Sequence, residues 1–260
     1  MGERHDGARR GDGRGTGALE HATDILIPAM RVERFAGLVE NVESTTPEPH
    51  TVWWMVGTDE AEAELRRLGQ QCFRDEGGTW GNRLNFMFAR THAPYVFLGA
   101  DDVRFHDGWL RAALGAQRGL EGVVAVADLF NPEGTLALVA RSYIERFSGC
   151  VDQPGVVIHP GYRHNYSETE LFGTARARRR FRYCPDAVVE HLHWANGKSP
   201  RDPVYDVCEE TMADDRARYM ARRGLWGEHD PSAARQFASR VASTLKRRAG
   251  SAIAAVGRSR

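Results

Sequence analysis

The most constraining feature of this 260-residue chain is an apolar run that ends in two adjacent carboxylates. Pro94 precedes Tyr95-Val-Phe-Leu98, and after Gly99-Ala100 the chain reaches Asp101 and Asp102. An apolar run rich in valine and phenylalanine predicts a buried strand of an α/β sheet. Such strands end at the edge where open α/β folds bind ligands. Because the two carboxylates repel each other, the pattern predicts either a divalent cation that carries phosphates or a solvated acidic turn.

Charge and cysteine content narrow the function classes. The chain has 35 basic and 35 acidic residues, so it lacks the excess positive charge of a protein that binds nucleic acid electrostatically. Its four cysteines form no Cys-x-x-Cys pair, which argues against structural zinc and indicates reduced thiols. No apolar run approaches the roughly 18 residues of a spanning helix. The Gly- and Arg-rich N-terminus does not resemble a secretory signal. We therefore expect a cytoplasmic protein.

Strand and helix patterns alternate along the first half of the chain, which predicts a doubly wound, mostly parallel sheet flanked by helices. We expect strands at 24–30, 51–56, 95–100, 123–127, 136–140, 181–184 and 187–194. Helical spacing is found at 31–43, from 60 to 72, and at 82–88, 107–114, 143–147, 168–179 and 211–224.

Composition and helical spacing distinguish the two ends of the chain from its middle. Residues 1–22 have almost no apolar side chains and are expected to form a disordered tail. The main domain is expected over 23–206, with a C-terminal helical extension over 207–260. Within that extension a basic amphipathic helix is predicted, which would dock on the domain, pair with a partner or lie on an anionic membrane surface.

Two further patterns carry chemistry. His191 and His193 alternate on a predicted strand and so share a face, where they are either metal ligands or half-buried strand histidines. Glu168 and Glu170 follow Ser167 at the start of a predicted helix. They either favour the positive end of the helix dipole or include a general base.

Four segments in order resemble the GT-A glycosyltransferases, especially family 2-like members. They are Ile25-Leu-Ile-Pro28, a Gly-rich turn leading to Asn82 and Asn85, the Phe97–Asp102 strand end, and the Pro185–His191 segment. The resemblance covers about residues 23–206. It implies that 23–127 binds a nucleotide sugar and that 128–206 contacts the acceptor.

The resemblance also implies a metal site for Mn²⁺ or Mg²⁺. The metal strand of the family ends in Asp-x-Asp-Asp, whereas Gly99 stands at the first position here. Asp101 would take the ligand position, with Asp102 as the spare carboxylate beside it. His191 has the spacing of the family's metal-binding histidine, and His193 would be either the ligand or its neighbour.

Catalytic and donor-binding roles follow from the same resemblance. Glu168 takes the position of the catalytic base, and Glu170 is the acid that follows it. Lys198 lies in a loop that would close over the pyrophosphate and neutralise its charge. The full set of expected donor-binding residues is Pro28, Ala29, Arg31, Asp59, Asn82, Asn85, Ala100, Asp101 and Lys198.

The expected function is a metal-dependent, hexosyl-type glycosyltransferase that moves a sugar from a nucleoside-diphosphate donor to an unidentified acceptor hydroxyl with inversion. One alternative is a sugar-phosphate nucleotidyltransferase, although Pro28-Ala-Met-Arg31 lacks the Gly-rich loop expected after the first strand of that class. The other is a non-catalytic protein that binds nucleotide sugars or glycans. Nucleic acid is not an expected partner except as a modified-base acceptor, and the C-terminal helix is a candidate for peripheral membrane contact.

Overall fold

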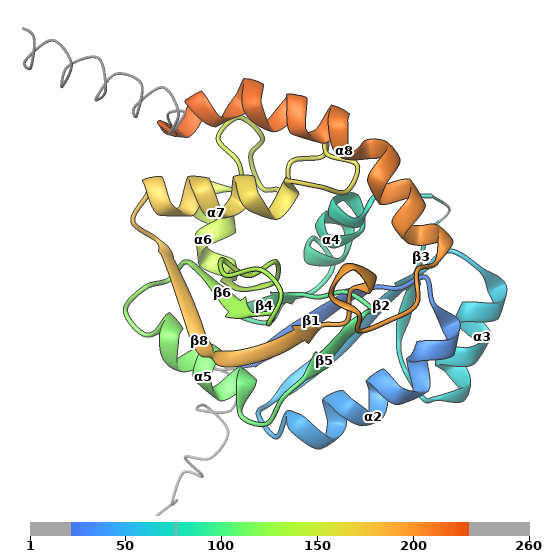
Figure 1. The fold of residues 1–260 in the computed structure, drawn as a ribbon. Helices are drawn as coiled ribbons and strands as arrows, with labels where there is room; N and C mark the ends of the chain where they lie inside the picture. The colour runs from blue at the N-terminus through green and yellow to red at the C-terminus, as the bar shows by residue number, and fades with distance from the viewer. Residues whose placement is uncertain (1–21, 76, 229–260) are drawn as a thin grey trace, which may run out of the picture.

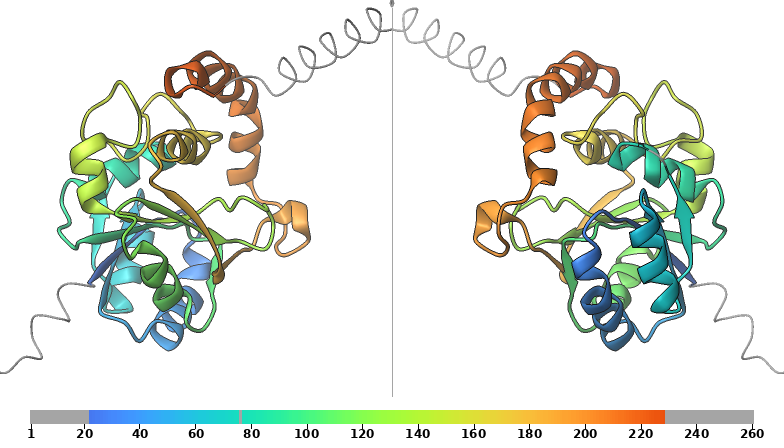
Figure 2. Two further views of the ribbon diagram at one scale, coloured as in Figure 1. Left: turned by 90° about the vertical axis from the view of Figure 1, so that its left-hand side faces the viewer. Right: turned by 90° about the vertical axis from the view of Figure 1, so that its right-hand side faces the viewer.

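An eight-stranded sheet lies between two layers of helices in the computed structural model, which describes residues 22–75 and 77–228 (Figures 1 and 2). The strand order is β3-β2-β1-β4-β7-β6-β8-β5. The strands are β1 (Thr23–Pro28), β2 (His50–Val56), β3 (Cys72–Arg74), β4 (Tyr95–Leu98), β5 (Val103–Phe105), β6 (Val123–Ala127), β7 (Ala137–Ala140) and β8 (Phe181–His191).

The helices connect these strands. The α-helices are α2 (Phe35–Thr45), α3 (Asp59–Arg67), α4 (Trp80–Phe88), α5 (Trp109–Gln117), α6 (Arg141–Phe147), α7 (Ser167–Ala177) and α8 (Pro203–Arg222). Short 3₁₀ helices are η1 (Val32–Arg34), η2 (Trp194–Asn196) and η3 (Arg223–Trp226).

Six strands point in the same direction, which confirms the expected mostly parallel sheet. β1 pairs in parallel with β2 and β4, β2 with β3, and β6 with β8. β7 is antiparallel to β4 and β6, and β5 is antiparallel to β8. The C-terminal ends of β1, β4, β6 and β8 therefore meet at one edge of the sheet.

The predicted central strand is buried on both faces, because its side chains enter two separate cores. Phe97 of β4 packs with α2, α3 and α5 on one face, and its ring centroid lies 4.7 Å from that of Trp109. Val96 and Leu98 pack with α4, α6 and α7 on the other face. This arrangement fixes the end of β4, and with it Asp101 and Asp102, at the sheet edge.

β8 differs from the prediction. Two strands were expected over 181–194, but a single strand runs from Phe181 to His191. Its pairing with β6 shifts register between Val126 and Ala127, next to Pro185, which has no N–H to donate to the ladder. Because β8 ends at His191, His193 lies outside the strand. The short strand β5, which pairs with β8, was not predicted.

Helix α8 begins earlier than expected and crosses the boundary placed at 206/207. Asp202 caps it by accepting a hydrogen bond from the Val204 N–H at 2.9 Å, and proline occupies its first position. Its far end contributes Tyr219 to a small core with Tyr162 and Trp226. Described residues of the predicted extension are thus packed on the main domain.

The remaining tail predictions lie outside the described residues. They concern the disordered segment 1–22, of which only residue 22 is described, and the basic amphipathic helix near the C-terminus. Within the described ranges, no helix is long and apolar enough to cross a membrane.

Candidate functional site

Charged and polar side chains gather where β1, β4, β6 and β8 end. Arg31 follows β1, Asp101 and Asp102 follow β4, Asp128 follows β6, and His191 is the last residue of β8. All three carboxylates are buried. The order of the sheet therefore assembles residues that are up to 160 positions apart in the chain, the separation of Arg31 from His191.

Asp101 fastens the segment after β1 to the end of β4. Its Oδ2 accepts hydrogen bonds from the backbone N–H groups of Met30 and Arg31, at 2.6 and 2.8 Å. Its Oδ1 accepts a third from Nη1 of Arg31 at 2.6 Å. Both carboxylate oxygens are therefore already engaged by the protein.

Asp102 is the carboxylate that faces a histidine. Its Oδ2 lies 3.5 Å from Nε2 of His191 and accepts a hydrogen bond from the Tyr205 hydroxyl at 2.9 Å. Burial alone would raise the pKa of Asp102. The hydrogen bond and charge of His191, the charge of Arg31 and the Tyr205 hydroxyl outweigh burial and hold this pKa below its usual range.

His191 responds in the opposite sense. Burial disfavours the charged imidazolium, but the hydrogen bond to Asp102 and the charges of Asp102 and Asp128 raise the pKa of His191 above its ordinary value. Its Nδ1 is buried and has no hydrogen-bond partner among the described residues. The backbone N–H of His191 donates to the Asp128 carbonyl at 2.9 Å, which fixes the end of β8 beside β6.

The Asp102–His191 pair fits a divalent cation. A carboxylate oxygen and an imidazole nitrogen 3.5 Å apart could serve as two ligands of one ion, and this donor set suits Mn²⁺. The resemblance assigned the ligand position to Asp101 and made Asp102 the spare residue. The structure instead places Asp102 opposite His191, while Asp101 is bound to the backbone and to Arg31.

Arg31 supplies positive charge to the same centre. Its guanidinium contacts Asp101 and Asp202 at 2.6 Å each, and Asp102 at 3.7 Å. It also lies over the ring of Tyr205, 4.8 Å from the centroid. Because the guanidinium is buried among carboxylates, it neutralises the repulsion between Asp101 and Asp102 that the sequence predicted.

Gly99, where the family motif has its first aspartate, lies against β1. A Cβ at this position would come within 2.9 Å of the Leu26 carbonyl oxygen. The Gly99 N–H donates to that same carbonyl at 2.8 Å, and its own carbonyl accepts from the Trp80 indole at 3.0 Å. The close approach of the two backbones therefore leaves no room for a side chain here.

His193 has a different environment from His191. Its Nδ1 accepts a hydrogen bond from the Ala195 N–H at 3.1 Å and caps η2. Its ring stacks on Phe130, with centroids 5.5 Å apart, and meets Tyr205 edge-on at 4.6 Å. The rings of His191 and His193 are 5.3 Å apart, so the structure brings them together, with His193 in an aromatic contact.

Glu168 lies at the start of α7, as the sequence predicts. Its carboxylate accepts hydrogen bonds from the hydroxyls of Ser167 and Thr169, at 3.2 and 3.4 Å. Burial raises the pKa of Glu168, while these hydroxyls and the positive charge of nearby His191 oppose the rise. A carboxylate with a raised pKa near the Asp102–His191 pair has the properties of a general base.

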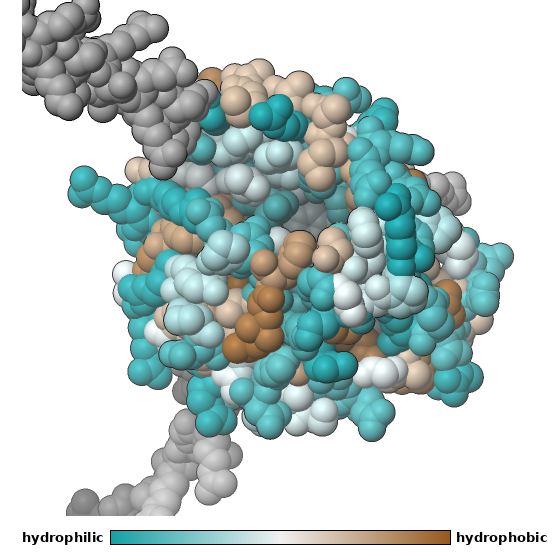
Figure 3. Space-filling view, viewed as in Figure 1, coloured by the Kyte–Doolittle hydropathy of each residue, from teal (hydrophilic) through white to brown (hydrophobic). Residues whose placement is uncertain are grey.

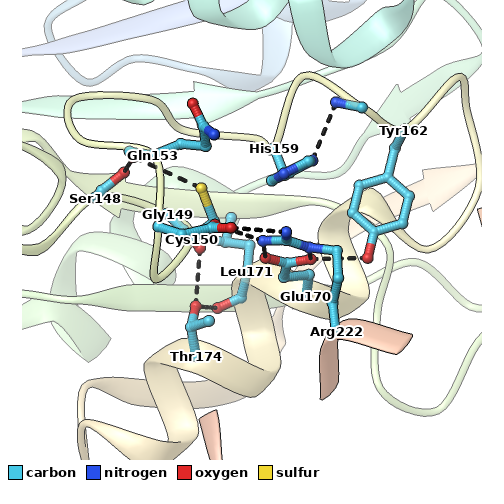
Figure 4. Close-up of polar contacts among 12 residues, drawn as sticks. Ser148, Gly149, Cys150, Gln153, His159, Tyr162, Glu170, Leu171, Thr174 and Arg222 are labelled. Carbon is cyan, nitrogen blue, oxygen red and sulfur yellow. Dashed lines mark hydrogen bonds and ion pairs between the residues drawn. The ribbon is translucent and has the colours of Figure 1, made fainter. Parts of the chain in front are cut away.

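Glu170 belongs to a second cluster, shown in Figure 4. It forms two hydrogen bonds with Arg222, at 2.7 and 2.8 Å, and accepts another from the Tyr162 hydroxyl. Cys150, Asp152 and Glu170 are close enough to hold a metal ion, but Arg222 also binds Asp152 at 2.7 Å and balances both carboxylates. Burial raises the pKa of Cys150 to about 11, so the thiol is protonated near neutral pH. This cluster therefore anchors α8 to α7.

Three residues that were expected to bind the nucleotide sugar have different surroundings in the structure. The side-chain amide of Asn85 donates to the Ile158 carbonyl at 2.7 Å and accepts from the N–H groups of Val157 and Ile158. Asn82 is exposed on α4. The fully exposed Asp59 side chain contacts Arg74 at 2.9 Å.

Of four further residues that were expected to bind the nucleotide sugar, three lie at the candidate site and the fourth is bound elsewhere. Pro28 is the last residue of β1, and Ala29 follows it and donates its N–H to the Met55 carbonyl, while Ala100 immediately precedes the two aspartates. These three lie at the candidate site. Lys198 instead forms an ion pair with Glu190 at 3.0 Å.

Three residues of the site were not predicted. Asp128 follows a buried strand in the way that Asp101 does, so the same pattern could have found it. Tyr205 and Asp202 come from a segment expected to be a loop, and their only sequence signal is Asp202-Pro203, a typical helix start. Their contacts with Asp102 and Arg31 depend on how α8 packs.

Comparison with solved structures identifies the fold. Glucosyl-3-phosphoglycerate synthase from Mycobacterium tuberculosis in complex with Mn²⁺, UDP-glucose and phosphoglyceric acid aligns with a TM-score of 0.55 and 16% identity, over 80% of this chain and 83% of that one. Its complex with Mg²⁺ and UDP gives a TM-score of 0.56 at 15% identity, over 80% and 83%. A mannosyltransferase from Pyrobaculum calidifontis in complex with GDP-mannose and Mn²⁺ aligns at 15% identity over 86% and 80%, with a TM-score of 0.49.

No protein-family model matches the chain, and no characterised protein sequence matches it significantly. At these identities the structural matches establish the fold alone. The protein has the GT-A-like fold of the glycosyltransferases, as the sequence motifs predicted.

Proposed function

We propose that this protein is a glycosyltransferase that uses a nucleoside-diphosphate sugar and a divalent metal ion, Mn²⁺ or Mg²⁺. The observation that carries the proposal is the Asp102–His191 pair, 3.5 Å apart at the C-terminal edge of a GT-A-like sheet. Aligned glycosyltransferases contain Mn²⁺ or Mg²⁺ with UDP or UDP-glucose, which supports the same ligand class here. When bound, the metal would stabilise the negative charge of the diphosphate leaving group.

The residues of this chain would have separate roles in metal binding and proton transfer. Asp102 and His191 would hold the ion, Arg31 would keep the buried carboxylates in place, and Glu168 would accept the proton of the acceptor hydroxyl. The acceptor oxygen would form a bond to the anomeric carbon as the bond from that carbon to the diphosphate breaks. Because Glu168 takes only a proton and forms no bond to carbon, this chemistry inverts the anomeric centre.

A thermal-unfolding series with nucleoside diphosphates, with and without Mn²⁺, tests the donor site. A ligand at about 100 times its dissociation constant stabilises the folded state by roughly 2.7 kcal/mol. For a domain of this size, that corresponds to a rise in Tm of about 5–11 °C. We expect one nucleotide to produce this rise only when Mn²⁺ is present.

Matched histidine variants identify the ligand. His191→Gln should remove the metal-dependent rise, whereas His106→Gln should retain it. His106 is a half-exposed histidine that faces Glu190 at 3.4 Å. Asp102→Asn provides a second variant of the pair that keeps the size of the side chain. A nucleotide response that does not need Mn²⁺, or that survives in His191→Gln, would contradict the assignment.

The role of Glu168 as general base is tested separately from nucleotide binding. Glu168→Gln should bind nucleotide and Mn²⁺ normally, while turnover with a sugar donor falls by about 10²–10⁴-fold, the usual contribution of a general base. Retention of full turnover would show that another group removes the proton. Glucose and mannose nucleotides, which define a hexosyl-type transfer, are the first donors to compare.

A further inference from the structure

Two large apolar side chains are exposed beside the candidate site. Leu129 and Phe130, which we call the apolar rim, follow β6 and are 63% and 45% exposed. Figure 3 shows apolar surface near the middle of this face, over the region where the loop after β6 lies in Figure 1. Exposing a leucine and a phenylalanine together is unfavourable in water. Their position next to buried charged residues therefore indicates a surface that binds a ligand.

The loop holds the rim in a fixed conformation. Asp128, which is fully buried, accepts hydrogen bonds from the Phe130 and Asn131 N–H groups, at 2.9 and 2.6 Å, and from the Thr135 hydroxyl at 2.9 Å. Leu129 has a φ of +59°, a left-handed conformation that is unfavourable for a leucine. The three hydrogen bonds of Asp128 stabilise this conformation, so the loop holds the rim in its exposed position.

Ring contacts connect Phe130 to the proposed metal-binding pair. Its ring stacks on His193 with an interplanar angle of 15° and lies edge-on to His191, with centroids 6.4 Å apart. His193 in turn contacts Tyr205, whose hydroxyl donates to Asp102. The rim is therefore continuous with the wall of the site.

The sheet order places the rim away from the half expected to bind the nucleotide. β6 is separated from β1 by β4 and β7, whereas β2 and β3 lie beyond β1 on the other side. A nucleotide bound over β1, β2 and β3 would leave the end of β6 open to the second substrate.

We propose that the apolar rim binds the acceptor, and that the acceptor carries an alkyl or aryl group next to its reactive hydroxyl. This inference rests on the proposed glycosyltransferase function and adds the chemical class of the acceptor. Leu129 and Phe130 offer adjacent apolar surface with no charge, which fits a hydrocarbon group better than a bare sugar. Phe130 is then a residue that determines acceptor specificity.

Ligand-observed NMR titrations with two probes test this directly. The probes are n-octyl β-D-glucoside below its micelle concentration and methyl β-D-glucoside, each measured with the nucleotide and Mn²⁺ bound. We expect the octyl compound to bind at least about tenfold more tightly. Phe130→Ala should reduce this preference about tenfold, because it removes one aromatic contact with the chain. Leu129→Ala should reduce it by a smaller factor.

Met220→Ala is the matched control, since Met220 is an exposed apolar residue of α8 at 40% exposure. It should keep the preference for the octyl probe. Equal binding of both probes would overturn the proposal. The same holds if Phe130→Ala leaves the preference intact, or if it weakens both probes equally, which would indicate stacking on a sugar.

The nucleotide and Mn²⁺ response of each variant separates this inference from the proposed function. If Phe130→Ala loses the octyl preference but keeps the nucleotide response, both proposals stand. If the wild-type protein shows no nucleotide response, the glycosyltransferase proposal fails, and the acceptor proposal that rests on it fails too. A nucleotide response without any octyl preference would overturn the acceptor proposal alone.

Discussion

Asp215 of α8 anchors the segment that leads into the helix carrying Glu168. Its carboxylate is buried, 1% exposed, and accepts hydrogen bonds from the backbone N–H groups of Arg163, His164 and Asn165, at 2.9, 2.8 and 2.8 Å. We predict that Asp215→Ala destabilises the protein by about 3 kcal/mol. A hydrogen bond to a charged group contributes roughly 1.5–3 kcal/mol, and water replaces part of that loss because this segment is partly exposed.

Chemical and thermal unfolding measure this effect. A loss of about 3 kcal/mol should lower Tm by about 6–12 °C for a domain of this size. Asp215→Asn should lose less, because an amide keeps one acceptor oxygen. The neighbouring Asp214 is exposed and provides the matched control, so Asp214→Ala should change stability by less than about 0.5 kcal/mol. If the free energies of unfolding of Asp215→Ala and Asp214→Ala differ by less than about 1 kcal/mol, the hydrogen bonds to Asp215 do not hold this segment in solution.

Three further predictions follow from the contacts of single residues. Asn85→Ala should cost about 2–3 kcal/mol in urea unfolding through the loss of three hydrogen bonds, and a cost no larger than that of the exposed Asn82→Ala would contradict this reasoning. Gly99→Asp, which restores the first aspartate of the family motif, should lower Tm without strengthening Mn²⁺ binding, because its Cβ would meet the Leu26 carbonyl at 2.9 Å; tighter Mn²⁺ binding would refute this. Burial lowers the pKa of His159, so its contribution to the free energy of unfolding is present above pH 6.5 and declines as pH falls through the folded-state pKa. Unfolding at pH 7.5 and 5.5 should show that His159→Gln has the weaker pH dependence, and an equal dependence would exclude this role.

The sequence predicted the fold through local patterns that the structure preserves. The apolar run before Asp101 is a strand buried on both faces, and strand and helix alternate as expected as far as β4. Where the pattern was interrupted, prediction was weaker. The predicted strands at 181–184 and 187–194 are one strand, because β8 continues past Pro185 with a register shift. The three-residue strand β5 is too short to give a periodic signal.

Within the candidate site, the sequence indicated which residues lie close together but not which of them face each other. The expectation that Asp101, Asp102 and His191 belong together agrees with their positions in the structure. Which aspartate faces the histidine was not predictable, since adjacent residues on one turn have the same sequence signal. Glu168 and Glu170 likewise share a helix start, yet Glu170 is bound by Arg222, which lies 52 residues later in the chain.

The sequence by itself determined that the main strands are buried and that polar residues follow their ends, because an apolar run predicts a buried strand. Only the tertiary structure decided the partners of each charged group. Arg31 reaches Asp202, and Tyr205 reaches Asp102, across 171 and 103 residues. Such contacts depend on the packing of α8 against the sheet edge, and no local pattern records that packing. The strand ends therefore supply most of the charged residues of the site, and the start of α8 supplies the contacts that position Arg31 and Asp102.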